Sequence, residues 1–561
     1  MQDFPWFKHY PKSVPKEVDV HAYGNIVDLF EECIIKYKDA VAYECMGKKM
    51  SFNQLDQLSQ NFAAFLQEDL GLKKGDRIAI QMPNLLQYPV VMFGALRAGL
   101  IIVNTNPLYT SKEMLHQFKD AKIEAIVILA NFASKLEEIL PELGVKHIII
   151  TEIGDMLGGM KGSIVNFVVK YIKQMVPTYH IKNKMALMDC LKKGVSSIFK
   201  PVEISSEDTA FLQYTGGTTG ISKGAELTHA NIVANMQQIS AWMLPKLKER
   251  EEMVITALPL YHIFALTVNC LAMLKIGAHN VLVTNPRDMK AFCKDLRTHP
   301  FSILTGVNTL FNGLLNQESF RNLDFSALKI SVGGGMAVQK YVAEKWKEVT
   351  GTPLAEGYGL TETSPVVSCN PIDGNERLGT IGLPLPNTEI KIIDDDGNAL
   401  SFGEKGELCI KGPQVMKGYW KMPEETAKVL SEDGWLKTGD IAVLNEDGYL
   451  KIVDRKKEMI LVSGFNVYPN EVEDAIASHE KVVEVGVIGI PDEQSTERVI
   501  AYVVPNDTSL SEEEVIQHSR QSLTSYKVPK EVHFVDELPK SNVGKILRRL
   551  IKENHQKKVL P

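Results

Sequence analysis

The chain has 561 residues, of which 44% are hydrophobic and 23% are charged, and its formal net charge is −7. Domains typically hold about 100–200 residues, so this length excludes a single core, and we expect a large domain with at least one smaller one. The composition excludes an intrinsically disordered chain, and the slight acidic excess argues against nucleic acid as a partner.

The cysteines and the apolar runs indicate the compartment. Seven cysteines lie far apart without a C-x-x-C pair, which argues against a disulfide framework or a structural zinc site and favours a reducing cytoplasm. The N-terminus lacks the apolar core of a secretory signal. Arg97 interrupts the longest apolar stretch, residues 88–103, so we expect no membrane-spanning helix, which needs about 18 or more apolar residues.

Helical and extended patterns alternate along the first part of the chain. Residues 51–70 place Leu55, Leu58, Phe62 and Leu66 at the spacing of an amphipathic helix. Further predictions are a helix over residues 84–98 and strands over residues 76–82, 100–103, 125–129 and 147–151. Such alternation predicts parallel sheets layered with helices, an α/β architecture.

The pattern changes after about residue 376. Short β-like runs separated by turn residues, such as those at 395–398, predict a compact β subdomain over about residues 376–453. Another segment starts near Asp454. It contains Pro469 at a position suited to the first turn of a helix. Strands are predicted there over residues 458–462, 482–490 and 500–504, so we expect a small separate α+β domain.

Residues 214–224 carry the clearest chemistry, with the sequence Tyr-Thr-Gly-Gly-Thr-Thr-Gly-Ile-Ser-Lys-Gly. The glycines let the backbone approach a ligand closely, the hydroxyl groups donate hydrogen bonds, and Lys223 adds a positive charge, which together suit a phosphate group. The spacing differs from that of the P-loop, in which lysine directly follows glycine. The alternative interpretation is a Gly/Thr-rich surface turn.

Residues 214–224 resemble the signature loop of the adenylate-forming superfamily, which contains acyl-CoA synthetases, luciferases and the adenylation domains of peptide synthetases. Further motifs follow in family order at residues 259–264, 333–335, 356–363, 434–440, 454–457, 464–469 and 539–549. The set covers almost the whole chain and most resembles bacterial long-chain fatty acyl-CoA synthetases. The resemblance implies a large domain of αβαβα layers with the β subdomain (residues 1–453), a hinge (residues 454–457) and a small mobile domain (residues 458–561).

The resemblance also assigns roles to single residues. Lys545, Thr218, Glu362 and His262 form the implied catalytic set, in which Thr218 and Glu362 hold Mg²⁺ through oxygen atoms. Lys545 stabilises negative charge in the first half-reaction, and His262 positions the acyl carboxylate. Contacts with ATP or coenzyme A are implied for Tyr214, Thr215, Gly216, Gly217, Thr218, Thr219, Gly220, Ser222, Lys223, Gly224, Gly333, Gly334, Gly335, Glu356, Gly357, Tyr358, Gly359, Thr361, Asp440, Arg455, Gly464 and Lys545.

Each assignment has a structural alternative. In the family reading, adenine lies on Tyr358 and both ribose hydroxyls bind Asp440, as acidic residues do in dinucleotide sites. Without the resemblance, Asp440 reads as a turn residue and Glu362 as a carboxylate at a helix start. Lys545 would be one basic residue of a charged tail, and His262 a buried structural histidine.

The implied reaction has two steps. A long-chain fatty acid attacks the α-phosphate of MgATP and releases pyrophosphate; coenzyme A then takes the acyl group and AMP leaves, which feeds fatty acid degradation and lipid metabolism. Rotation about Asp454 withdraws Lys545 between the steps and brings Gly464 to a channel for coenzyme A. Apolar pocket walls are expected from residues 263–274 and 306–315, although core packing explains those segments equally well.

Residues 156–188 contain no acidic residue and alternate lysines with apolar residues. Ile164, Val168, Ile172 and Met175 recur at helical spacing, which is typical of a basic amphipathic helix on an anionic membrane surface. A helix packed on the large domain has the same pattern. We expect a cytoplasmic protein that contacts the inner face of the cell membrane peripherally.

Rival interpretations keep the fold and change the function. A fatty acyl-AMP ligase serving a carrier protein usually has an insertion near the small domain, which the sequence lacks. An amino-acid adenylation domain needs a carrier domain, and a luciferase is disfavoured by overall resemblance. A non-catalytic protein that binds or imports fatty acids is the rival from another class. The oligomeric state is left open, a homodimer included.

Overall fold

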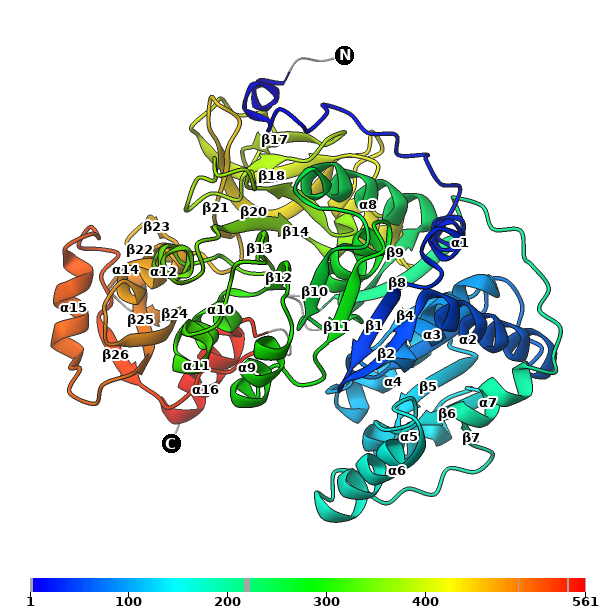
Figure 1. The fold of residues 1–561 in the computed structure, drawn as a ribbon. Helices are drawn as coiled ribbons and strands as arrows, with labels where there is room; N and C mark the ends of the chain where they lie inside the picture. Colours follow the sequence, from blue (N-terminus) through cyan, green and yellow to red (C-terminus); the bar gives the residue numbers. More distant parts are fainter. Residues whose placement is uncertain (1–3, 216–221, 493, 542–543, 560–561) are drawn as a thin grey trace.

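The computed structural model describes residues 4–215, 222–492, 494–541 and 544–559. Figure 1 shows two unequal parts, a large α/β body and a smaller body formed by the C-terminal chain in orange and red. The predicted fold class is confirmed: the large N-terminal part layers helices on sheets, and the small C-terminal part mixes strands and helices.

The first sheet of the large part has eight strands in the order β19-β9-β8-β4-β3-β5-β6-β7. All neighbours from β8 to β7 run parallel, and β9 and β19 are antiparallel additions. The strands are β3 (Arg77–Gln81), β4 (Ile101–Asn104), β5 (Ala125–Leu129), β6 (His147–Thr151), β7 (Met185–Ala186), β8 (Thr209–Thr215), β9 (Lys223–Thr228) and β19 (Gly418–Tyr419). Thr215 lies opposite Lys223, so these two residues mark the base of the predicted phosphate loop.

The second sheet has nine strands in the order β16-β15-β14-β13-β12-β10-β11-β1-β2. The strands are β1 (Val41–Cys45), β2 (Lys48–Ser51), β10 (Met253–Thr256), β11 (His279–Leu282), β12 (Ile303–Gly306), β13 (Ile330–Gly333), β14 (Leu354–Gly359), β15 (Val366–Cys369) and β16 (Leu383–Pro384). From β1 to β14 the neighbours run parallel, so the carboxyl ends of β13 and β14 meet at one edge.

Helices cover and separate the two sheets. Every residue of α3 (Gln87–Arg97) is buried, and Phe93 stacks on Phe30 of α1 (Ile26–Tyr37) with 3.9 Å between ring centroids. The remaining helices of the large part are α2 (Phe52–Ala64), α4 (Ser111–Ala121), α5 (Ala133–Ile139), α6 (Gly159–Phe167), α7 (Leu187–Gly194), α8 (His229–Met243), α9 (Met289–Thr298), α10 (Asn308–Leu315), α11 (Glu318–Arg321), α12 (Lys340–Thr350) and α13 (Pro423–Val429). Two apolar core clusters lie in this part, and the larger one extends from Trp6 to Leu450.

A four-stranded antiparallel sheet forms the predicted β region, in the order β17-β18-β20-β21. Its strands are β17 (Glu389–Ile393), β18 (Lys405–Lys411), β20 (Leu436–Leu444) and β21 (Leu450–Arg455). Asp440 of β20 lies opposite Arg455 of β21. The last strand of this sheet therefore leads straight into the small part.

The small part has its own apolar core. Its sheet contains β22 (Ile460–Val462), β23 (Phe465–Val467), β24 (Val482–Asp492), β25 (Thr496–Pro505) and β26 (Glu531–Phe534), with helices α14 (Pro469–Ala477), α15 (Glu512–Arg520) and α16 (Arg548–Val559). Two hydrogen bonds from α10 tie it to the large part. Thr309 Oγ1 donates to the Gly544 carbonyl at 3.2 Å, and Asn312 Nδ2 donates to the Val483 carbonyl at 3.1 Å.

The predicted strands before residue 152 are confirmed to within one residue at each end. The predicted helix over residues 51–70 begins at a capping box formed by Ser51 and Gln54, and α2 passes after Ala64 into a π turn. The helix predicted over residues 84–98 starts later, at Gln87, because the Asn84 side chain donates to the carbonyls of Thr256 and Leu258 and its own backbone stays outside the helix.

Gly382 lies where the β region meets the second sheet, and we predict that any side chain at this position destabilises the protein. Its φ is +77°, and a Cβ atom would lie 2.1 Å from the Asn370 nitrogen. Gly397 has a similar φ of +88° with open space around it, so Gly397→Ala should cost only about 1 kcal/mol of backbone strain. Gly382→Ala should lower the unfolding free energy by about 1–3 kcal/mol more, measured by denaturant unfolding. Equal losses in the two variants would contradict the close approach.

Candidate active site

A cavity of about 1570 Å³ lies between the large and small parts and is lined by both. The structure brings most of the predicted site residues to it. Those that line it are Tyr214, Thr215, Lys223, His262, Gly334, Gly335, Gly357, Tyr358, Gly359, Thr361, Glu362, Asp440, Arg455 and Lys545. Gly216, Gly217, Thr218, Thr219 and Gly220 lie outside the described residues.

The aromatic ring of Tyr358, near the carboxyl end of β14, meets the carboxylate of Asp440, in the middle of β20. The Tyr358 hydroxyl donates to Asp440 Oδ2 at 2.6 Å, and Arg455 Nε lies 3.5 Å from Asp440 Oδ1. Burial and the nearby Asp440 carboxylate raise the pKa of Tyr358 well above its usual value, so the phenol stays protonated and donates. A flat ring beside a fixed carboxylate suits an adenosine, whose base stacks and whose ribose hydroxyls donate.

Glu362 follows β14 and is held by the segment around β19. The Tyr419 hydroxyl donates to Glu362 Oε1 at 2.8 Å, and the Met416 amide donates to the Glu362 carbonyl at 2.8 Å. Lys223 forms an ion pair with Glu425, and its ammonium lies 5.0 Å from the centroid of the Tyr419 ring. Glu362 and Lys223 therefore face the cavity on either side of Tyr419.

The donor set around Glu362 fits a hard cation such as Mg²⁺, which prefers oxygen ligands and keeps several waters of its own. Glu362 lines the cavity and uses one oxygen for Tyr419. Within the described ranges no cluster of three or more His, Cys, Asp or Glu side chains could hold a metal ion. A Mg²⁺ ion bound here would take further oxygen ligands from a phosphate group and from water. The other predicted ligand, Thr218, lies outside the described residues.

Lys545 enters the cavity from the small part on a tight turn. The Ser541 amide donates to the Lys545 carbonyl at 2.7 Å, and the Lys545 amide donates to Ser541 Oγ at 3.1 Å. Burial, and then the positive charge of Arg455, lower the pKa of Lys545 to about 8. A bound anion would oppose both effects, so the surroundings of Lys545 favour an anionic ligand such as a polyphosphate.

His262 is neutral near pH 7, because burial and the nearby Lys545 lower its pKa to about 4. Its Nδ1 accepts a hydrogen bond from the Phe264 amide at 3.3 Å, so the proton of the neutral ring sits on Nε2. A neutral donor of this kind can orient a carboxylate without a charge of its own. The predicted positioning role remains compatible with this geometry.

Several predicted contact residues lie outside the cavity lining. Gly464 is exposed on the small part, and Ser222 instead accepts a hydrogen bond from His116 Nε2 at 2.8 Å through its carbonyl. A Cβ atom on Gly333 would meet Val338 at 2.5 Å, so its role is close packing beside β14. Gly224 packs against the Tyr214 ring in the same way.

Glu356 points away from the cavity toward the small part. Its Oε1 accepts a hydrogen bond from the Val338 amide at 3.1 Å. Burial is the main cause that raises its pKa to about 8, and the Asp474 carboxyl adds to the shift. Asp474 itself has a pKa raised to about 7 by burial and by Glu473. Two carboxyls thus face each other where the two parts meet.

One limb of the cavity is apolar and was only partly predicted. Ile263, Phe264 and Val268 line it, as expected for residues 263–274. The expectation for residues 306–315 was wrong for every residue of that range, because α10 packs Phe311 edge-on against Trp346 in the core. The other walls come from residues that sequence reasoning missed, namely Ile239, Trp242, Met243, Val366 and Leu385. The sequence of α8 gives only a weak signal for this role, because its buried residues include Asn235, Gln237 and Gln238 as well as Ile239 and Trp242.

The lining of the cavity is rich in cations. The basic residues that line it are Lys223, Lys428, Lys437, Arg455, Lys456, Lys457, Lys540, Lys545, Arg548, Arg549 and Lys552, against the acidic residues Glu113, Glu362, Glu407, Asp440, Glu458 and Glu497. A cleft with an excess of one charge raises the local concentration of ligands of the opposite charge. The cavity lining thus combines an excess of basic residues, the Tyr358–Asp440 pair and a group of apolar side chains.

The same combination defines a known class of proteins. Residues 30–420 match the family of AMP-binding enzymes, and residues 471–545 match the AMP-binding enzyme C-terminal domain. The chain belongs to this family of ATP-dependent ligases. A long-chain-fatty-acid–CoA ligase of Yersinia pestis is 54% identical over 552 residues, which covers 98% of each chain.

Solved structures give the same fold. ATP-bound MatB from Rhodopseudomonas palustris is 27% identical and superposes with a TM-score of 0.80, covering 95% of this chain and 99% of its own. The anthranilate CoA ligase AuaEII, in complex with anthranoyl-AMP, is 23% identical and superposes with a TM-score of 0.86 over 97% of this chain and 100% of its own.

We predict that Glu356→Gln stabilises the protein at alkaline pH. The folded pKa of about 8 exceeds the ordinary value of 4.5, so the stability of the wild-type protein declines as pH rises from about 4.5 through 8. Glutamine keeps the acceptor for the Val338 amide and removes this cost. The melting temperature of the variant should exceed that of the wild type by about 2 °C or more at pH 8.5 and match it at pH 4.5. A lower melting temperature at pH 8.5 would show that the carboxylate stabilises the fold.

Proposed function

We propose that the protein is a long-chain fatty acid–CoA ligase, which converts a fatty acid, ATP and coenzyme A into acyl-CoA, AMP and pyrophosphate. The observation that carries this proposal is that Lys545 lines the cavity near enough to both Asp440 and His262 to interact electrostatically with each, and His262 is followed by the apolar lining residues Ile263 and Phe264. That place is where a carboxylate at the end of an alkyl chain would meet the α-phosphate of ATP. The full-length identity to long-chain-fatty-acid–CoA ligases supports the acyl substrate, and acyl-CoA feeds fatty acid degradation and lipid metabolism.

In the first step the fatty-acid carboxylate forms a bond to the α-phosphorus as the bond to pyrophosphate breaks. Tyr358 and Asp440 hold the adenosine, the neutral His262 donates to the carboxylate, and Lys545 neutralises charge that builds on the phosphoryl oxygens. Thr218 and Glu362 would hold Mg²⁺, which supplies further neutralisation of the polyphosphate. The attacking acid is already ionised at pH 7, so no general base is needed.

In the second step the thiolate of coenzyme A attacks the acyl carbon and AMP leaves. Lys545 now occupies the space between the two parts, so we infer that the small domain first rotates about residues 454–457. Gly464 is exposed in the present orientation, and the rotation would bring its face to the cavity. On this proposal the large domain ends at residue 453 and the small, rotating domain begins at residue 458.

The function is tested by product analysis with ATP, Mg²⁺ and a series of fatty acids, with and without coenzyme A. We expect AMP and acyl-CoA only with coenzyme A and fastest for long chains. Acyl-adenylate formation that ignores coenzyme A but responds to a carrier protein would instead identify a carrier-dependent ligase. Saturable binding of fatty acid without turnover would identify a binding protein.

Lys545→Met should slow acyl-adenylate formation by about 10²–10³-fold, because one charge-stabilising contact in a buried site has that effect. Thioester formation from supplied acyl-adenylate should change far less. In the wild type, kcat/KM for ATP should fall above pH about 8, since the free enzyme then loses the Lys545 proton. An unchanged alkaline limb in Lys545→Met, measured on its residual activity, would assign that ionisation to another group.

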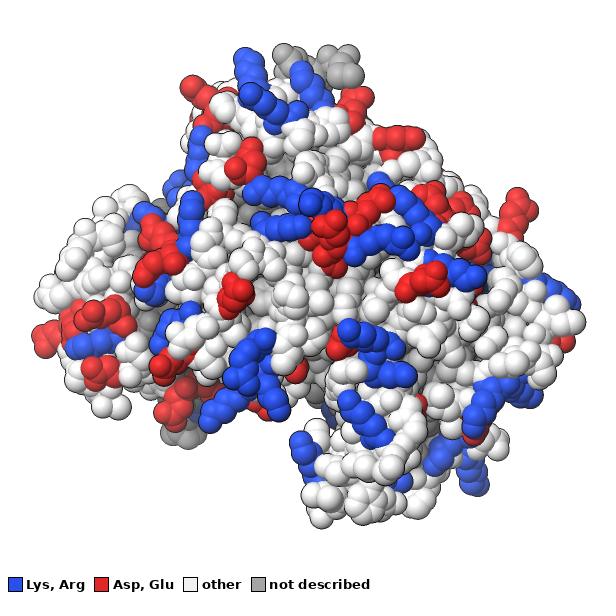
Figure 2. Space-filling model, in the orientation of Figure 1, with Lys and Arg blue, Asp and Glu red and all other residues white. Residues whose placement is uncertain are grey.

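The predicted membrane-contacting segment has an exposed apolar face. Among the described residues no helix is both long and apolar enough to cross a membrane. On α6 and the turn that follows, Met160, Ile164, Phe167, Tyr171, Ile172 and Met175 are each more than half exposed. Figure 2 shows Lys and Arg scattered over the white surface of the lobe that carries α6. This arrangement supports peripheral contact with an anionic leaflet, where the substrate is dissolved.

Replacing Ile164, Phe167 and Ile172 by Asn in one variant should lower the affinity for anionic vesicles at least about tenfold. Each apolar side chain then loses its burial in the membrane interface. Ile198→Asn, at a site that is 66% exposed outside this face, is the matched control. Vesicle sedimentation gives the binding constants. Equal binding of both variants would show that α6 does not contact the membrane.

A further inference from the structure

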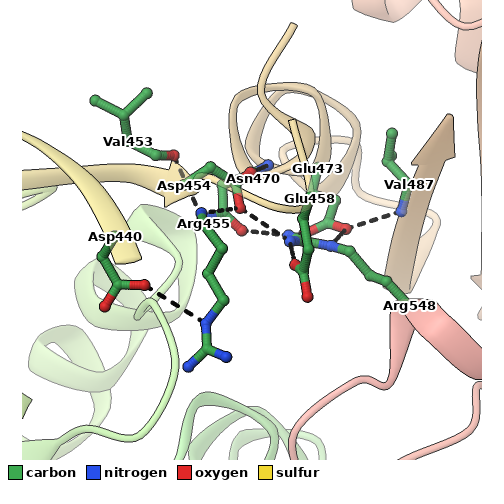
Figure 3. Close-up of polar contacts among 9 residues, drawn as sticks. All are labelled: Asp440, Val453, Asp454, Arg455, Glu458, Asn470, Glu473, Val487 and Arg548. Carbon is green, nitrogen blue, oxygen red and sulfur yellow. Dashed lines mark hydrogen bonds and ion pairs between the residues drawn. The ribbon is translucent and has the colours of Figure 1, made fainter. Parts of the chain in front are cut away.

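Arg548 is the first residue of α16 and the centre of a buried polar cluster (Figure 3). Its guanidinium donates to Glu473 through Nε at 2.8 Å and through Nη2 at 2.6 Å, a bidentate pair. It also donates to Asp454 Oδ1 at 3.1 Å, to Glu458 and to Asn470. All five N–H groups of the guanidinium therefore have acceptors, an arrangement that lysine cannot reproduce.

The partners of Arg548 belong to the two sides of the hinge. Asp454 lies on β21 and is paired with Ile441 of β20, so its backbone belongs to the large part. Glu473 and Asn470 lie on α14, which moves with Arg548 as one piece of the small part. Glu458 follows the hinge and belongs to the small part as well.

Asp454 depends on the small part for its hydrogen bonds. Its side chain is fully buried, with 0% exposure, and accepts from the Asn470 amide at 2.7 Å as well as from Arg548. The Arg455 amide donates to the same carboxylate at 2.7 Å from its own side of the hinge. Rotation about residues 454–457 would thus remove two of the three donors from a buried carboxylate, which is costly.

Arg548 itself would lose little in that rotation. Its bonds to Glu473, Asn470 and Glu458 lie within the small part and move with it. The contact between Arg548 and Asp454 is therefore the one charged contact of the cluster that holds only in the present orientation. Two residues separate Arg548 from Lys545, and one of them, Leu547, donates its amide to the Pro539 carbonyl at 2.8 Å, which holds this segment in place.

We propose that Arg548 is a positioning residue, a latch that joins the hinge carboxylate to the base of the Lys545 turn and favours the orientation in which Lys545 occupies the cavity. This inference rests on the proposed two-step function. The latch strengthens adenylate formation, which needs Lys545 in place, and its release accompanies the turn to thioester formation. Arg548 touches no reacting atom in this role.

The test separates the two half-reactions. Arg548→Lys keeps the charge beside Glu473 and cannot reach Asp454 at the same time, so adenylate formation should fall about 10–100-fold while thioester formation from supplied acyl-adenylate stays within about threefold. Arg498→Lys is the control, because Arg498 pairs with Glu531 at 2.7 Å on the surface of the same domain. Asp454→Asn combined with Arg548→Lys should lose less than the sum of the two single losses, because the two variants share one broken contact.

A distance between the two parts tests the latch without any turnover. All seven native cysteines are buried, so spin labels can be directed to Glu344→Cys on α12 and Arg520→Cys on α15. We expect one main distance in the otherwise unchanged protein and a second, populated distance when Arg548→Lys is added. Equal losses in both half-reactions, or one unchanged distance, would overturn the latch. A wild type that forms no adenylate would overturn the proposed function, and the distances would still decide the latch.

Discussion

The structure depends on bringing one lysine into a buried, already cationic cavity. Lys545 meets Arg455 there, and burial and that like charge both disfavour its charged form. An anion relieves both costs at once, because it pairs with the ammonium and screens it from Arg455. The surroundings of Lys545 thus favour a polyphosphate, and in the function that we propose the binding of ATP and the protonation of Lys545 support each other.

The two bodies of the protein divide this task. The large part supplies Tyr358 and Asp440, which are joined by a 2.6 Å hydrogen bond, and α8 supplies part of the apolar wall. In the mechanism that we propose, the small part supplies the charge of Lys545 in the first step and withdraws it before the second. A short link at Asp454 makes that exchange available, and the buried network of Arg548 sets which orientation is preferred.

Much of the fold could be predicted because its signals are local. Strands such as β6 (His147–Thr151) are short apolar runs between helices, and their predicted ends agree with the structure to within one residue. The motif residues Tyr358, near the end of β14, and Glu362, just after it, both line the cavity. Glu356 could not be placed in the same way: neighbouring strand residues point to opposite faces, and a motif does not state which face looks into the cavity.

Other features needed the tertiary structure. The packing of Phe311 on Trp346 places residues 306–315 in the core, and the cavity is instead lined by Ile239, Trp242 and Met243 at the end of α8, whose sequence mixes polar and apolar residues. The apolar residues of α6 have the spacing of a core helix, yet they face solvent. Arg548 reads in the sequence as one charge of a basic tail, because its three carboxylate partners come from segments far away along the chain.

The most direct test of the account is a crystal structure with a non-hydrolysable acyl-adenylate analogue bound. The account predicts adenine against Tyr358, ribose hydroxyls on Asp440, the alkyl chain in the limb beside Trp242, and the Lys545 ammonium within hydrogen-bond distance of the acyl or phosphoryl oxygens. An analogue whose alkyl chain lies outside this limb, or whose phosphoryl group has no contact with Lys545, would contradict it.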